Sequence, residues 1–346
     1  MIARLWSALK RALSWFRRGP EARGTVHKGS HSAFGRTFSL IQLTAGRRPY
    51  LLYLPEHYTV TERLPMVVMM HGCRQDAEVF AAATRMNRRA DRERFIVLYP
   101  EQRRLANPHR CWNWFSGSAQ AGAGEASILA DMIRSLAVEH DVEPRRVYLA
   151  GLSAGAAMSV NLAVSHPDLF AACALHSGLM FEAGSSTSEA LDAMRHGAHR
   201  HPEDAARRAY RMARGRVEAI PVMVIHGDRD ETVNPVNADQ IVLQFTELNR
   251  LLGSEAHREE IAPRVRRREE RSLGGYRYDV TDHDYLGRTL VRQVTVRGLG
   301  HAWSGGLADY PYNDPLGPDA AGLICDFFAE HGLGSGRASL PAQSPA

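Results

Sequence analysis

A serine flanked by glycines is the first feature of the sequence that could do chemistry. Ser153 lies in the segment Gly-Leu-Ser-Ala-Gly at 151–155, between an apolar strand-like run and a helical pattern. In this context the G-x-S-x-G motif is typical of a nucleophile elbow, a tight turn that exposes the serine hydroxyl at the carboxyl edge of a sheet. We expect any side chain at Gly151 or Gly155 to collide with the neighbouring strand or helix. The pattern predicts a nucleophilic serine.

A serine nucleophile needs a base and an acid, and both follow it in the expected chain order. His301 comes shortly after the apolar run at 290–296, within Gly-Leu-Gly-His, while Asp228 and Asp230 come after the run at 222–225. His301 would take the proton from Ser153, and a carboxylate would hold the imidazole in the correct tautomer. We favour Asp230 as this carboxylate, because it lies further into the loop, where it can turn back towards His301.

Two backbone N–H groups would have to stabilise the developing oxyanion. Ala154, the residue after the nucleophile, is expected to supply the first. The second is expected from the segment His-Gly-Cys-Arg-Gln at 71–75, which follows an apolar run. Here Gly72 allows close approach of the backbone, and Cys73 or its neighbour can aim an N–H at the site. We expect His71 to shape this loop through hydrogen bonds within it.

The elements that must position these residues alternate along the chain. Apolar β-rich runs alternate with helical patterns, which is typical of a parallel sheet covered by helices. Strands are predicted at 50–54, 66–70, 95–99, 147–150, 172–175, 222–225 and 290–296. Helices are predicted at 77–92, 125–140, 154–165, 235–252 and 318–330. We expect one α/β domain over residues 36–332, with a mostly parallel, doubly wound sheet and helices on both faces.

Two insertions and the end of the chain stand apart from this alternation. Residues 181–218 could cap a site, whereas 254–275 contain the charge run 264–271 and are expected to form a solvated face. Residues 333–346 are rich in Ser, Pro, Gly and Ala, a composition that predicts a disordered tail. The mixed Gly, Pro, Ser and His content of 19–35 predicts a linker.

Residues 1–18 place apolar side chains on one helical arc and Arg and Lys on the other, which predicts an amphipathic basic helix. Such a helix could lie on a lipid or hydrophobic polymer surface, or pack on its own domain or a partner. Lys10 and Arg11 interrupt the apolar stretch that a secretory signal needs. We therefore favour a cytoplasmic protein without excluding secretion.

Charge and hydropathy exclude two other classes. The formal net charge is +5, but seven basic residues and one acid among the first 30 residues carry +6, which leaves −1 for the rest. A near-neutral body gives no support to a nucleic-acid-binding fold. The sequence has no run of about 18 apolar residues, so a membrane-spanning helix is not expected.

Cysteines and aromatic residues complete the candidates. The sequence holds no CxxC pair or histidine cluster with metal spacing, so neither a metal nor a cofactor is implied. Cys173 and Cys325 are expected to be buried apolar residues. Trp112 and Trp303 are candidates to line an apolar cleft for substrate, since ligand pockets are lined by aromatic side chains. Trp114 and its neighbour Phe115 are expected in the core.

Five segments together resemble the esterase family of polyhydroxybutyrate (PHB) depolymerases. They are HGCRQ at 71–75, CWNWF at 111–115, AGLSAGAAMS at 150–159, HGDRDETV at 226–233 and GLGHAWSGG at 298–306. More distantly they are similar to feruloyl and acetylxylan esterases. Over about residues 35–332 the resemblance implies an α/β-hydrolase fold, a triad of Ser153, Asp230 and His301, and the Cys73 and Ala154 amides as oxyanion donors.

The same resemblance implies a substrate, namely ester bonds of a short-chain hydroxyalkanoate polymer or its oligomers. It also implies a Cys73–Cys111 disulfide that braces the oxyanion loop, although cysteines in a reducing cytosol more often stay thiols. The chain is more similar to the intracellular members, which attack storage granules, because we recognise neither a signal peptide nor a separate polymer-binding domain. Residues 1–18 would then supply the contact with a granule or phospholipid surface.

Two alternative functions stay open. One is a feruloyl or acetylxylan type of carbohydrate esterase, which would use the same serine chemistry. The other is a non-catalytic granule-surface protein held by its N-terminal helix, because a fold alone does not establish activity. The presence of Ser153, Asp230 and His301 in catalytic order argues against this second alternative.

Overall fold

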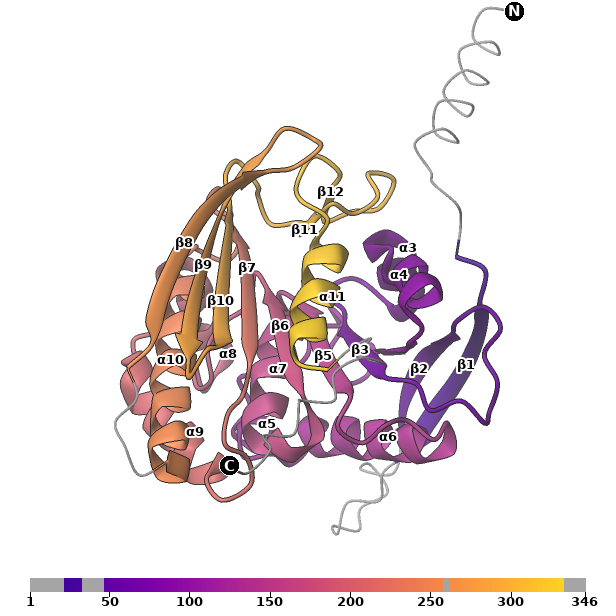
Figure 1. Ribbon diagram of the computed structural model, residues 1–346, viewed down its shortest axis with the longest axis horizontal. Helices are drawn as coiled ribbons and strands as arrows, with labels where there is room; N and C mark the ends of the chain where they lie inside the picture. Colours follow the sequence, from indigo (N-terminus) through magenta and orange to yellow (C-terminus); the bar gives the residue numbers. More distant parts are fainter. Residues whose placement is uncertain (1–21, 33–46, 258–261, 333–346) are drawn as a thin grey trace, which may run out of the picture.

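A ten-stranded mixed sheet forms the frame of the molecule (Figure 1). The structure, a computed structural model, describes residues 22–32, 47–257 and 262–332. In chain order the strands of this sheet are β1 (Thr25–Ser32), β2 (Arg47–Leu54), β3 (Met66–Met70), β4 (Ile96–Pro100), β5 (Val147–Leu152), β6 (Ala172–His176), β7 (Val222–Gly227), β8 (Arg264–Arg271), β9 (Arg277–Tyr285) and β10 (Arg288–Val296). Across the sheet they follow the order β1-β2-β4-β3-β5-β6-β7-β10-β9-β8.

The six strands from β4 to β10 in this order run parallel, and the strands at both edges are antiparallel. The inner strands β3, β4 and β5 are buried along their whole length, which explains why their sequences are continuous apolar runs rather than alternating ones. All seven predicted strands are present, and the predicted mostly parallel sheet is confirmed. A separate pair of two-residue strands joins β11 (Trp303–Ser304) to β12 (Asn313–Asp314).

Helices cover both faces of the sheet and enclose two hydrophobic cores. They are α3 (Ala77–Thr84), α4 (Met86–Glu93), α5 (Gly117–Gln120), α6 (Glu125–Glu139), α7 (Ala154–Ser165), the 3-10 helix η1 (Pro167–Leu169), α8 (Thr187–His196), α9 (Pro202–Ala213), α10 (Val236–His257) and α11 (Ala320–Glu330). Helices α6 to α10 pack around one core, which we call the α7-side core. Helices α3, α4 and α11 pack around the other, the α11-side core (Figure 1).

The helix predicted at 77–92 is two helices. Arg85 adopts a left-handed conformation with φ 62°, which ends α3 and begins α4. The Thr84 hydroxyl donates a hydrogen bond of 2.8 Å to the carbonyl oxygen of Phe80 at this break. The turn lets Phe80 and Met86 both enter the α11-side core. Since no glycine or proline marks the break, the apolar pattern alone reads as one continuous helix.

The linker predicted at 19–35 is partly wrong. Residues 25–32 form β1, an edge strand that pairs with β2 in antiparallel register. Most of its side chains are exposed, so its sequence lacks the hydrophobic alternation that signals a strand. The sheet of the catalytic domain therefore begins at residue 25, earlier than the predicted start at 36.

The two insertions carry regular structure. The first, at 181–218, holds α8 and α9. The charge run in the second is β8, which pairs with β9 at the other edge of the sheet. Its side chains are almost all exposed, as expected for a solvated face, and charged side chains on an edge strand discourage pairing with other chains.

Two predictions lie outside the described residues: the amphipathic helix at 1–18 and the disordered tail at 333–346. Within the described residues, none of the helices has the length and apolar character needed to cross a bilayer.

Candidate active site

Ser153 occupies the sharp turn between β5 and α7. Its backbone has φ 57° and ψ −123°, a region that costs a residue other than glycine about 1–3 kcal/mol. A Cβ at Gly155 would lie 2.2 Å from the carbonyl oxygen of Met70, and a Cβ at Gly151 would lie 2.6 Å from the carbonyl carbon of Gly155. Both glycines are therefore required by close backbone approach, as predicted from the motif.

The structure brings Ser153, His301 and Asp230 into one hydrogen-bonded chain. The distance from Ser153 Oγ to His301 Nε2 is 3.0 Å, and that from His301 Nδ1 to Asp230 Oδ2 is 2.7 Å. Asp230 and His301 follow β7 and β10, which are parallel neighbours, so their loops meet at one edge of the sheet. Asp228 is exposed and accepts a hydrogen bond of 2.7 Å from the Gly298 amide instead.

Asp230 accepts hydrogen bonds on both carboxylate oxygens. The amides of Thr232 and Val233 donate to Oδ1 at 3.0 and 2.8 Å, and Nε2 of His226 lies 3.3 Å from Oδ2, the oxygen that faces His301. Burial would raise the pKa of Asp230, but the hydrogen bonds from His226 and His301 outweigh it and hold the pKa far below its ordinary value. An ionised Asp230 requires a proton on His301 Nδ1, which leaves Nε2 free to accept the serine proton.

His226 is a positioning residue to which the sequence analysis assigned no role. Its side chain is buried, and its Nε2–H also donates to the carbonyl oxygen of Val233 at 2.8 Å. It therefore ties the carboxylate of Asp230 to the backbone of the same loop. The signal that could have identified it is its place at the end of a buried strand, four residues before the acid.

Replacing His226 with leucine should lower kcat for a soluble ester about 10- to 100-fold with little change in KM. A hydrogen bond to a charged group contributes about 1.5–3 kcal/mol, and this one acts on Asp230 rather than on substrate. His226→Gln keeps an N–H donor and should recover part of the loss. Steady-state kinetics of the two variants checks the prediction. Equal kcat values in His226→Leu and His226→Gln would contradict it.

The loop after β3 lies against the nucleophile. A Cβ at Gly72 would be 3.6 Å from the Cβ of Ser153, and the Gly72 amide donates to Gln75 Oε1 at 2.9 Å. The next residue is Cys73. Neither its amide nor that of Ala154 has a hydrogen-bond acceptor within the described part of the chain. The two predicted oxyanion donors thus stand on the two segments that flank Ser153.

His71 is fully buried and shapes this loop, as expected. Its Nδ1–H donates to the carbonyl oxygen of Gly72 at 2.8 Å, and its Nε2 accepts from the amide of Gln102 at 3.0 Å. Burial lowers the pKa of His71 to about 4, so the ring is neutral near pH 7. This pair of bonds needs the neutral form, because a protonated ring has no acceptor.

Trp112 and Trp303 do not line a cleft, so the prediction that they bind substrate is wrong. The exposed fraction is 0% for Trp112, whose indole N–H donates to the carbonyl oxygen of His71 at 3.0 Å. It is 1% for Trp303, whose ring stacks on His176 and meets Phe80 edge-on. Both rings pack behind the catalytic loops. Trp114 lies in the α7-side core, as expected.

His176 supports the loop of His301 from beneath. It is fully buried, and its Nε2 accepts a hydrogen bond of 3.2 Å from the amide of Ser304. Burial, together with the nearby His226, lowers the pKa of His176 to about 3. The neutral ring can therefore accept this bond throughout the neutral pH range.

We expect the free energy of unfolding to fall on acidification. His71 and His176 titrate in the folded protein with pKa values of about 4 and about 3, against about 6.5 in an unfolded chain. Between about pH 6.5 and 4 the unfolded chain therefore binds more protons. Each histidine's stabilisation is complete above about pH 6.5 and is lost by up to about 1.4 kcal/mol per unit as the pH falls. Urea titrations at pH 7, 6 and 5 measure this slope, which should be shallower in His71→Gln. An unchanged slope would contradict it.

A disulfide between Cys73 and Cys111 joins the loops after β3 and β4. The resemblance implied this pair, and the structure contains it, with Cα atoms 4.3 Å apart. Cys173 and Cys325 are free and buried, as expected. The disulfide fixes the segment that carries the Cys73 amide, so it braces the oxyanion loop.

Replacing both Cys73 and Cys111 with serine should lower the free energy of unfolding by about 2–4 kcal/mol. The bond closes a loop with a sequence separation of 38, and removing it restores that entropy to the unfolded chain. Urea titration measures the loss. Dithiothreitol should reproduce it in the unchanged protein and have no further effect on the double variant. Equal sensitivity of both proteins to dithiothreitol would contradict this account.

The described residues hold no group of three or more His, Cys, Asp or Glu side chains that could bind a metal ion. What the residues do offer is a nucleophile, a base, an oriented acid and two free amides around one serine oxygen. This arrangement can perform acyl transfer through a covalent intermediate.

Comparison with known proteins places the chain in a family. The family described as "Esterase PHB depolymerase" matches residues 48–269. Poly(3-hydroxyalkanoate) depolymerase C of Paucimonas lemoignei is 33% identical, over 68% of this chain and 54% of the relative. Feruloyl esterase B of Thermothelomyces thermophilus is 27% identical, over 56% of this chain and 68% of the relative.

A solved structure supports the fold. An acetyl xylan esterase from Aspergillus awamori superposes with a TM-score of 0.64 at 19% identity, covering 88% of this chain and 99% of that one. The likeness confirms the predicted α/β-hydrolase fold. The chain spans about half the length of the Paucimonas relative. By the extent of the family match and the identity to this relative, the chain belongs to the PHB depolymerase family of esterases.

Proposed function

We propose that the protein is a serine ester hydrolase that works through an acyl-enzyme. The observation that carries this proposal is the hydrogen-bonded chain of Ser153, His301 and Asp230, with spans of 3.0 and 2.7 Å. A binding protein has no need of an ionised carboxylate that fixes a histidine tautomer beside a strained serine. The alternative of a non-catalytic surface protein is therefore less well supported.

Ser153 Oγ attacks the ester carbonyl carbon while its proton passes to His301 Nε2. The amides of Cys73 and Ala154 stabilise the oxyanion of the tetrahedral intermediate. The C–O bond to the leaving alcohol then breaks, and His301 returns the proton to that alcohol. Water, deprotonated by His301, attacks the acyl-enzyme in the second half, which releases the carboxylic acid and restores Ser153.

The substrate that we propose is a short-chain hydroxyalkanoate polyester or its oligomers. The family and the Paucimonas relative, named as a poly(3-hydroxyalkanoate) depolymerase, support this choice. A carbohydrate esterase of the feruloyl or acetylxylan type is the second candidate, and it is supported by relatives that carry those names at 27–29% identity. Both candidates use the same triad and differ only in what binds beside it.

The proposal includes a granule or phospholipid contact through residues 1–18, whose basic amphipathic pattern supports it. Deleting residues 1–18 should reduce binding to granules and leave hydrolysis of a soluble ester intact. Cytoplasmic location stays a prediction. The Cys73–Cys111 disulfide weighs against it, because such bonds persist mainly in oxidising compartments.

The experiment compares amorphous PHB granules, acetylated xylan, a methyl ferulate ester and a soluble p-nitrophenyl ester, with Ser153→Ala as the control. Release of hydroxybutyrate that disappears in the variant supports the polyester. Cleavage of the xylan or ferulate ester without release of hydroxybutyrate would overturn the polyester assignment and support a carbohydrate esterase. Absence of any Ser153-dependent hydrolysis would overturn the catalytic proposal.

A further inference from the structure

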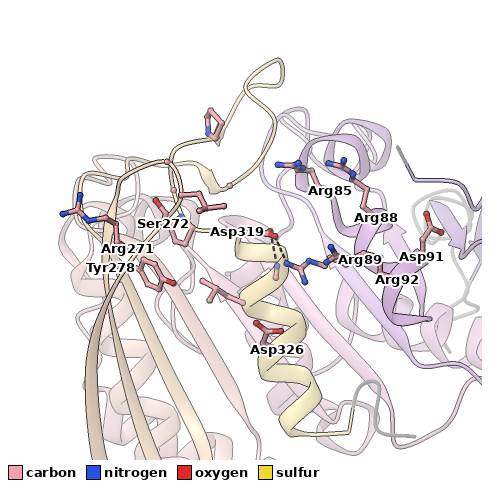
Figure 2. A pocket seen from close by; sticks show the side chains of 18 of the residues that line it. Arg85, Arg88, Arg89, Asp91, Arg92, Arg271, Ser272, Tyr278, Asp319 and Asp326 are labelled. Carbon is pink, nitrogen blue, oxygen red and sulfur yellow. Dashed lines mark hydrogen bonds and ion pairs between the residues drawn. The ribbon is translucent and has the colours of Figure 1, made fainter. Parts of the chain in front are cut away.

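A wide groove on the α11 side of the sheet has no part in the catalysis described above. It has a volume of about 800 Å³ and lies between α4, the first half of α11 and the turn that joins β8 to β9 (Figure 2). Ser153, Asp230 and His301 are not among the residues that line it. The loop at 315–319 forms part of its wall.

Arginine dominates the charge of this groove. Six arginines and four carboxylates line it, an excess of two positive charges, and the arginines are Arg23, Arg85, Arg88, Arg89, Arg92 and Arg271. Arg88, Arg89 and Arg92 lie on α4, where residues three and four apart share a face, and Arg85 directly precedes the first residue of this helix. Figure 2 shows these side chains along one wall, with Arg271 on the other side.

Arg89 has a structural role within this set. Its guanidinium contacts Asp319 at 2.7 Å and Glu93 at 3.1 Å, so it ties α4 to the start of α11. Burial would lower the pKa of Arg89, but the hydrogen bonds with these two carboxylates outweigh it and raise the pKa. The charge of Arg89 is thus compensated within the protein.

Arg85 and Arg271 lie on opposite walls of the groove, and both differ from Arg89 in their charge partners. Within the described part of the chain, neither has a carboxylate at ion-pair distance. Arg85 is half-buried and Arg271 is exposed. A guanidinium presents paired N–H donors that match the oxygens of a phosphate group. The two arginines therefore offer uncompensated charge from both sides of the groove.

Apolar side chains lie on the rim beside this charge. Leu273 is fully exposed at the tip of the β8–β9 turn, and Leu316 on the neighbouring loop is about half exposed. The Ser272 hydroxyl donates to the carbonyl oxygen of Leu316 at 2.7 Å, which joins the two segments into one rim. Exposed leucines next to basic side chains are typical of surfaces that enter the boundary between lipid headgroups and acyl chains.

A lipid surface fits these features better than a nucleic acid. Beyond the first 30 residues the chain has a formal charge of −1, whereas nucleic-acid binding requires a broad basic face. A soluble phosphate compound would use the arginines and leave Leu273 without a role. An anionic lipid supplies both a phosphate group and an apolar boundary.

We propose that the groove and its leucine rim dock on an anionic lipid surface. Arg85 and Arg271 hold lipid phosphate groups, while Leu273 and Leu316 enter the headgroup boundary. This surface belongs to the catalytic domain and is distinct from residues 1–18. It does not depend on the proposed ester chemistry.

The test is sedimentation of the full chain with vesicles of phosphatidylglycerol and phosphatidylcholine, or of phosphatidylcholine alone. Arg85→Glu/Arg271→Glu should lower the partition coefficient on anionic vesicles by at least about tenfold, because each basic residue near an anionic surface contributes to the free energy of binding. Leu273→Ser should lower it about fivefold. The matched control is Arg195→Glu/Arg211→Glu, two exposed arginines on α8 and α9 that likewise lack a carboxylate at ion-pair distance among the described residues.

Retention of vesicle binding in the control pair and its loss in the groove pair support the proposal. Equal loss in both pairs would reduce the effect to net charge and overturn it. Equal binding of the unchanged protein to anionic and neutral vesicles, or no effect of the groove pair, would also overturn it. Groove-dependent binding of millimolar glycerol phosphate by a protein that does not bind anionic vesicles would assign the groove to a soluble phosphate compound instead. Hydrolysis of a soluble ester by the same preparations reports on folding and on the catalytic proposal separately.

Discussion

Ser153→Ala is expected to lower kcat for a soluble p-nitrophenyl ester by about 10⁴-fold or more, with the fold unchanged. The variant removes Ser153 Oγ, which lies 3.0 Å from His301 Nε2. Without this oxygen no acyl-enzyme can form. Residual hydrolysis would come from water bound beside the oxyanion donors. Loss of one triad member typically leaves only about 10³- to 10⁴-fold of catalysis over water.

A matched control lies on the same helix. Ser165 near the end of α7 is also buried, and its Oγ donates to the carbonyl oxygen of Asn161 at 2.7 Å. Ser165→Ala should keep kcat within a few-fold of the unchanged protein. A fluorophosphonate probe should label the unchanged protein and Ser165→Ala but not Ser153→Ala. Persistent labelling of Ser153→Ala would place the nucleophile elsewhere.

The second large effect is expected from Asp230→Asn, at about 10⁴-fold in kcat. An asparagine can present its N–H₂ group to His301 Nδ1, which then becomes the acceptor and moves the proton to Nε2. In that tautomer His301 no longer accepts the proton of Ser153. The surrounding bonds of Asp230, from the Thr232 and Val233 amides, require little change of shape for the variant.

Asp228→Asn is the control for this variant, because it lies in the same loop and keeps an acceptor for the Gly298 amide. Its kcat should change by no more than a few-fold. Circular dichroism and the urea midpoint check that both variants fold. Comparable losses of kcat in the two variants would show that the loop, rather than the charge of Asp230, matters.

The candidate catalytic residues were predictable because each one lies in the segment that follows a parallel strand of the sheet. Ser153, Asp230 and His301 come after β5, β7 and β10, and parallel strands bring their carboxyl ends to the same edge. The glycines around Ser153 add a local constraint that only a tight turn explains. The reasoning needed only strand positions and chain order, which an apolar run reveals well.

Edge strands were harder to predict, for a physical reason. β1 is mostly exposed, so its side chains show no alternation of burial. In β9, which lies next to the edge strand β8, the inward positions include Asp282, which is fully buried and bound by Arg292 at 2.6 Å. A buried ion pair interrupts the apolar pattern that would have marked the strand. The buried charge is compensated by Arg292 on the neighbouring strand β10 and by Arg268, which lies 2.8 Å from the same carboxylate.

The direction of aromatic side chains also escaped sequence reasoning. Trp303 lies two residues after His301, but its ring meets His176 and Phe80, which are remote in the sequence. Proximity to a catalytic residue along the chain therefore says little about which way a ring points. The role of His226 was not predicted for a related reason, because its bond to Asp230 depends on the path of the loop after β7.

The time for which the protein stays active depends on both hydrophobic cores. Ser153 directly precedes α7, which packs in the α7-side core, whereas Leu299 and Trp303 on either side of His301 are buried in the α11-side core. The 3.0 Å contact between nucleophile and base survives only while both cores hold. Local opening on either face separates the pair, so heat inactivation follows whichever core opens first. For engineering, substitutions that stabilise only the more stable core leave the half-life of the catalyst unchanged. Stabilising substitutions should therefore be made in the less stable core.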